Sequence, residues 1–65
     1  MWVQVKSAPN LIMAEMWKEL FEGEGIPARV LPDSEKKPGS GEPAGYRIFV
    51  SQEKVHVVEE VLRKL

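Results

Sequence analysis

The fold of this chain is decided at residues 46–50, which read YRIFV. β-Branched and aromatic residues dominate the stretch, and these residue types favour extended strands. With a period of two, Ile48 and Val50 share one face, whereas Arg47 and Phe49 share the other. The stretch therefore predicts a strand with its aliphatic face in a core and a second face that carries an arginine beside an aromatic ring.

The segment after this strand changes to a helical period. Over residues 52–65 one stripe is apolar, and it comprises Val55, Val58, Val61, Leu62 and Leu65. Ser51 is a suitable N-cap, and Glu53 lies where an acidic side chain favours a helix start. Residues 52–65 are therefore predicted to form an amphipathic helix.

The segment before the strand contains a long polar loop and a short edge strand. Residues 33–45 hold no apolar residue larger than Ala44 apart from prolines, so they bury too little surface to order themselves. We expect a flexible loop at 33–45. Residues 28–31 are β-prone and are flanked by Pro27 and Pro32, which cannot donate ladder hydrogen bonds and therefore indicate an edge strand.

The first third of the chain repeats the change from strand to helix. Residues 2–6 alternate and predict a half-buried strand with Val3 and Val5 inward. Either Ser7 or Asn10 can cap the following helix over residues 11–24. Its predicted buried stripe is Met13, Trp17, Leu20 and Phe21, with Ala14 and Met16 on the flanks. Gly23 and Gly25 are both candidates for its left-handed C-terminal cap.

These elements predict a single α+β domain over residues 1–65, with the order β-α-β-β-α. Two helices with one apolar stripe each would cover one face of a three-stranded sheet, and the third strand would lie between the first two. The arrangement is ferredoxin-like but lacks the last strand. With 65 residues the core is close to the lower size limit for independent folding, which makes self-association a natural expectation.

The hydrophobic spacing resembles that of a family of small prokaryotic signal transducing proteins of otherwise unknown function. The resemblance covers nearly the whole chain and rests on Ala14, Leu20, Gly25-Ile26, Gly45, Ile48, Val50, Val58 and Leu62. That family is distantly similar to the PII nitrogen regulators. The resemblance implies a role in signal transduction. PII proteins have a fourth strand that this chain lacks, so their trimeric assembly and nucleotide site are not implied.

Composition narrows the class of function. The net charge of −1 argues against a nucleic acid as the partner, because such binders usually carry a positive excess. The absence of cysteine excludes disulfides and thiolate metal sites, and it favours a reducing, cytoplasmic location. No apolar run has the length of a signal peptide or a membrane span, so we expect no membrane partner.

The sequence offers no catalytic constellation. His56 is the sole histidine, and it lies beside Glu59 and Glu60 on the outward face of the last helix. Such a pair could touch a metal, but a solvated polar face explains it better, so no metal site and no cofactor are predicted. The carboxylates also lie on outward helix faces, where nothing would raise a pKa for acid catalysis. We therefore expect no enzymatic activity.

The glycine-rich part of the loop is a candidate site for a small anionic ligand or nucleotide. Its residues are Lys36, Lys37, Gly39, Ser40 and Gly41. A phosphate loop needs its lysine after the glycines and a helix next, whereas here the lysines come first and a strand follows. A plain flexible connection is the competing interpretation.

The main candidate site is the sheet face turned away from the helices. It is predicted to carry Trp2, Gln4, Lys6, Arg29, Leu31, Arg47 and Phe49. Aromatic side chains beside arginines are typical of protein interfaces. Stacking of single-stranded nucleic acid and coverage of Trp2 and Phe49 by the long loop are the alternatives. The favoured hypothesis is a small regulatory or interaction module that binds a protein partner or a second copy through this face.

Overall fold

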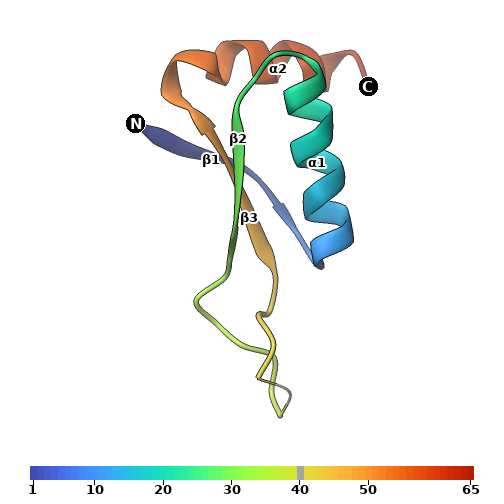
Figure 1. Cartoon of the computed structure of the whole chain (residues 1–65), viewed down its shortest axis with the longest axis vertical. Coiled ribbons are helices and arrows are strands. Elements are labelled where there is room, and N and C mark those ends of the chain that lie inside the picture. The colour runs from blue at the N-terminus through green and yellow to red at the C-terminus, as the bar shows by residue number, and fades with distance from the viewer. Residues whose placement is uncertain (40) are drawn as a thin grey trace.

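The computed structural model of the 65-residue chain describes residues 1–39 and 41–65. The described residues form an α+β fold with a sheet of three strands and two α-helices (Figure 1), as predicted. The elements are β1 (Trp2–Ala8), α1 (Leu11–Gly23), β2 (Ala28–Pro32), β3 (Tyr46–Ser51), a 3₁₀ turn (Gln52–Lys54) and α2 (Val55–Arg63).

The strand order is β1-β3-β2, with β3 antiparallel to both neighbours. β1 and β2 are therefore parallel to each other and are joined by the crossover helix α1, which confirms the predicted topology. β2 pairs regularly with β3, so that Ala28 is opposite Val50 and Val30 is opposite Ile48. These four residues share the sheet face that enters the core.

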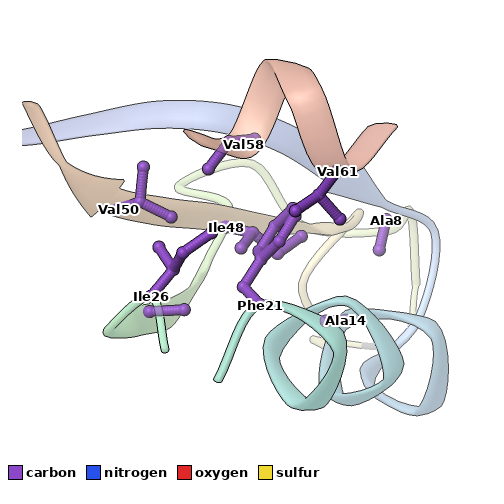
Figure 2. Packing of buried hydrophobic residues seen from close by; sticks show 9 residues of the cluster. Ala8, Ala14, Phe21, Ile26, Ile48, Val50, Val58 and Val61 are labelled. Carbon is purple, nitrogen blue, oxygen red and sulfur yellow. The ribbon is translucent and has the colours of Figure 1, made fainter. Parts of the chain in front are cut away.

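The core lies between that sheet face and the two helices (Figure 2). Its largest fully buried side chains are Phe21, Ile26, Ile48, Val50 and Val58. Around them lie the smaller buried residues Ala8, Ala14, Ala28 and Val61. Three of these nine residues are alanines, so the core has little volume, as expected for a chain of this length.

The buried stripe of α1 is narrower than predicted. Ala14 and Phe21 are buried, but Met13 and Met16 are exposed, with Met16 at 56%. Ala14 has almost no side chain, so the helix backbone can approach the sheet there, and Phe21 fills the space beside it. The helix is therefore rotated so that Ala14 and Phe21 face the sheet and both methionines face outward. Leu65 was also predicted to be inward, and it is 73% exposed.

The helix ends resolve the choices that the sequence left open. The Asn10 side chain accepts a hydrogen bond of 2.8 Å from the Met13 amide, so Asn10 is the N-cap of α1. Gly25 takes the left-handed conformation (φ 80°), and the next amide, of Ile26, donates to the Phe21 carbonyl at 2.9 Å. Ser51 precedes a 3₁₀ turn and makes no side-chain cap, because α2 starts only at Val55.

The loop over residues 33–45 continues the β2–β3 hairpin and extends away from the body of the protein (Figure 1). Three backbone hydrogen bonds cross it, from Asp33 to Gly45, from Ala44 to Glu35 and from Lys37 to Glu42, at 2.8, 2.9 and 2.8 Å. Pairing between the two arms thus continues beyond the strands. The flexibility expected for this loop stays a prediction.

Candidate interaction surface on the open face of the sheet

A β-bulge interrupts the regular alternation of side chains between the two faces of β1. Gln4 is opposite Phe49, whereas Lys6 is opposite the next residue of β3, Ile48, so Val5 is an extra residue in β1. A bulge of this kind changes the phase of the side-chain alternation. Residues of β1 before and after Val5 therefore do not follow one regular alternation.

The prediction that Lys6 lies on the open face is wrong for this reason. Lys6 is paired with the buried Ile48 on the helix side, and its ammonium lies 4.5 Å from the centroid of the Trp17 ring of α1. Ala8 is buried on the core side, although it lies an odd number of residues after Val3, which a regular strand would not allow on one face. The burial of Ala8 therefore agrees with the bulge.

The remaining predicted residues of the open face are brought together by the register. One row across the sheet consists of Gln4, Phe49 and Arg29, in the order β1, β3, β2. The next row consists of Ser7, Arg47 and Leu31. Ser7 belongs to this face because of the bulge, and the sequence pattern did not place it there. We use the name open face for Trp2, Gln4, Ser7, Arg29, Leu31, Arg47 and Phe49.

Trp2 and Arg29 meet although they lie on the two outer strands. The guanidinium carbon of Arg29 is 4.4 Å from the centroid of the Trp2 ring, a distance typical of a cation–π contact. The contact therefore crosses β3 on the side that carries Phe49. It limits the rotamers of two long side chains before any partner arrives, which reduces the entropy that binding would cost.

Arg47 is paired within the protein. Its Nε donates to Asp33 Oδ1 at 2.6 Å, and Asp33 is the first residue after β2. The two side chains are 43% and 30% exposed, so we expect the ion pair to contribute at most about 1 kcal/mol. Its main consequence is electrostatic. The carboxylate of Asp33 compensates the charge of Arg47, so Arg29 supplies the positive charge of the open face. Sequence reasoning assigned Asp33 only to the loop.

The described residues of the loop, 33–39 and 41–45, do not cover Trp2. Trp2 is opposite Ser51, at one end of β3, whereas the loop joins β3 at Tyr46, at the other end (Figure 1). The alternative in which the loop folds back over Trp2 is therefore wrong. Phe49 lies between these two ends and is half-buried.

The loop residues predicted to hold an anion are arranged around a hairpin. Lys36 forms an isolated bridge with Pro43, and Gly39 and Gly41 have positive φ angles of 78° and 74°. Ser40 lies outside the described residues. A hollow of ≈ 350 Å³ beside the start of α1 is lined by both Lys37 and Glu42. The negative charge of Glu42 therefore offsets the positive charge that Lys37 would offer to an anion. Anion binding by the loop stays a prediction.

His56 is exposed on α2. Within residues 1–39 and 41–65, no three histidine, aspartate or glutamate side chains are arranged to hold a metal ion. None of the described helices has the length and apolar character needed to cross a membrane.

Comparison of the chain with protein-family models, with curated proteins and with solved structures found no match. The resemblance to the prokaryotic signal transducing proteins therefore stays a hypothesis.

Proposed function

We propose that this protein is a small non-enzymatic interaction module that acts in signalling by pairing two copies through the open face. The contact between Arg29 and Trp2 carries the proposal. It holds an aromatic ring across the central strand, beside Phe49, on the side of the sheet opposite the core. The resemblance to signal transducing proteins supports the proposed role.

The chemistry of the open face suits a protein surface. Trp2 and Phe49 are the apolar anchors, and tryptophan in particular is enriched among the residues that dominate binding energies. Arg29 lies over the Trp2 ring, where its charge can orient the partner. Because Asp33 neutralises Arg47, two copies can approach with little mutual repulsion.

The open face is small for a protein interface. Three strands about 4.8 Å apart and about 20 Å long give a footprint of roughly 300 Å². A stable complex usually buries about 800 Å² on each partner. We therefore expect a reversible dimer whose population changes with concentration, which is a suitable property for a regulatory module.

The bulge favours face-to-face pairing over edge pairing. β1 is an outer strand and could in principle pair with a strand of another copy. Its ladder is interrupted at Val5, and bulges on outer strands are one of the ways in which proteins prevent such pairing.

The test is the molar mass in solution over a concentration series, measured by light scattering or sedimentation. We expect the mass of the wild type to rise toward that of a dimer and the mass of Phe49→Ala to stay that of a monomer. Ile12→Ala removes an exposed apolar side chain from α1 instead, and it should behave like the wild type. Circular dichroism checks that each variant is folded.

A wild type that stays monomeric at all concentrations would contradict the proposal, and so would a Phe49→Ala variant that still dimerises. Titration with single-stranded oligonucleotides tests the alternative that the open face stacks nucleic-acid bases. Binding that falls steeply with salt would assign the open face to that ligand class instead.

A further inference from the structure

The outer side of α1 carries more apolar surface than the core uses. Buried Ala14 and Phe21 mark the direction of the core, yet the apolar side chains continue around the helix through Leu20, Met16 and Ile12. At 100° per residue this arc spans roughly 200°, whereas a surface helix needs about 100° to cover a core. Ile12 is 77% exposed.

Part of this surface is hollowed into a groove of ≈ 540 Å³. We call it the methionine groove, and its lining is Met13, Met16, Trp17, Glu19, Leu20 and Leu65. Leu65, which follows α2, also lines it, so the groove is formed by α1 and by the segment after α2. It lies on the helix side of the sheet and is separate from the open face.

The lining indicates the shape of an occupant. Methionine side chains are unbranched and polarisable, and they adapt to different apolar surfaces, which is why they are frequent in promiscuous binding grooves. Along α1 the lining positions Met13, Met16, Trp17 and Leu20 follow helical spacing. Such a row is complementary to the apolar face of another helix, which inserts its own side chains at matching intervals.

The charges beside the groove indicate the sign of the charge that a partner would carry. Glu19 lines the groove, and Glu15, one turn earlier, is exposed and continues the same ridge. Residues 11–24 contain four glutamates and one lysine, a net charge of −3. On the Trp17 flank, the Lys6 ammonium lies over the Trp17 ring. An occupant with lysine or arginine along one flank would meet the acidic ridge.

The same charges argue against a second copy in the groove. In an antiparallel pair of α1 helices related by two-fold symmetry, each flank of one helix faces the same flank of the other helix. The ridge of Glu15 and Glu19 would then meet an identical ridge, and like charges at this spacing repel.

We infer that the methionine groove binds a basic amphipathic helix of a partner protein. The helix lays apolar side chains at positions i, i+3 or i+4, and i+7 between Met16 and Leu65, and it directs its cationic side chains to Glu15 and Glu19. This inference rests on α1 and Leu65 and is independent of the function proposed for the open face.

The probe is a fluorescein-labelled 18-residue peptide of leucine and lysine with helical spacing. Its controls are a scrambled peptide of equal composition and a peptide with glutamate in place of lysine. We expect the basic helical peptide alone to raise the anisotropy, and the amide shifts it causes in NMR spectra should map to α1 and Leu65.

Variants separate the groove from general charge attraction. Met16→Lys should weaken binding about tenfold, because it places a cation among apolar anchors. Glu19→Lys should weaken it about threefold to fivefold. Glu59→Lys makes the same change of net charge at an exposed position of α2 outside the groove lining, and it should stay within twofold of the wild type.

Three results would overturn the inference. The acidic or scrambled peptide could bind equally well, the NMR shifts could map outside α1 and Leu65, or Glu59→Lys could match the loss seen with Glu19→Lys. A dimer that Met16→Lys dissociates and Phe49→Ala leaves intact would assign the groove to a second copy and likewise overturn it.

Discussion

Arg29 lies over the ring of Trp2 at 4.4 Å, although the two residues belong to strands that are separated by β3. The contact ties the two outer strands together across the open face. It also fixes which side of the indole ring remains available to a partner. The stability of the sheet and the shape of the candidate interface therefore depend on the same pair.

Arg29→Met should remove this contact and keep most of the aliphatic stem. We expect a loss of about 0.5–1 kcal/mol in the free energy of unfolding, the usual contribution of an exposed cation–π pair. In a Trp17→Phe background the emission should also change, because Trp2 is then the fluorescent indole. Arg63→Met, on the exposed end of α2, serves as the control in urea titrations. Equal losses in both variants would contradict a specific role for Arg29.

Gly25→Ala should destabilise the protein by about 1 kcal/mol or more, because a side chain at φ 80° is strained. Gly23→Ala is the matched control. An added Cβ meets nothing within 4 Å at either position, so the pair isolates backbone conformation from packing. We expect Gly23→Ala to be neutral or slightly stabilising, since alanine is the better helix former. Thermal and urea unfolding measure both, and similar values for the two variants would refute this account of the helix end.

Asn10→Ala should lower the free energy of unfolding by about 1 kcal/mol, because the Met13 amide loses its side-chain acceptor. Ser7 was the competing cap candidate and is an exposed residue of β1. Ser7→Ala should therefore change the stability by only a few tenths of a kcal/mol. The reverse order in urea unfolding would assign the cap to Ser7.

Asp33→Asn should release Arg47 and loosen the base of the long hairpin. The ion pair is partly exposed, so we expect a loss of less than about 1 kcal/mol in global stability. Faster hydrogen exchange at the cross-loop amides of Lys37 and Ala44 should be the larger effect. Glu35→Gln removes a loop carboxylate that makes no ion pair among the described residues, and it should leave the exchange rates unchanged. Unchanged exchange in Asp33→Asn would show that the pair does not restrain the hairpin.

The architecture was predictable because its signals are local. The alternation of Ile48 and Val50 with Arg47 and Phe49, and the helical spacing of Val58 and Val61, each lie within one element. Once both periods are recognised, three strands and two helices have few ways to bury their apolar faces. The place of the third strand in the middle of the sheet follows from that constraint.

The candidate site was only partly predictable because it depends on relations between elements. Arg29 and Phe49 were correctly assigned to one face, since each follows the alternation of its own strand. Lys6 was not, because the extra residue at Val5 is defined only by the pairing with β3. The ion pair of Arg47 with Asp33 joins residues fourteen positions apart and has no local signature.

The sequence by itself determined the order of the elements, the topology of the sheet and the absence of cysteine chemistry, because composition and periodicity are properties of the chain. The tertiary structure alone decided the phase change in β1, the contact of Arg29 with Trp2 and the rotation of α1 that leaves Met13 and Met16 outside the core. Strand register and helix rotation are set by close packing around small residues such as Ala14. The packing involves all elements at once, and no single stretch of sequence encodes it.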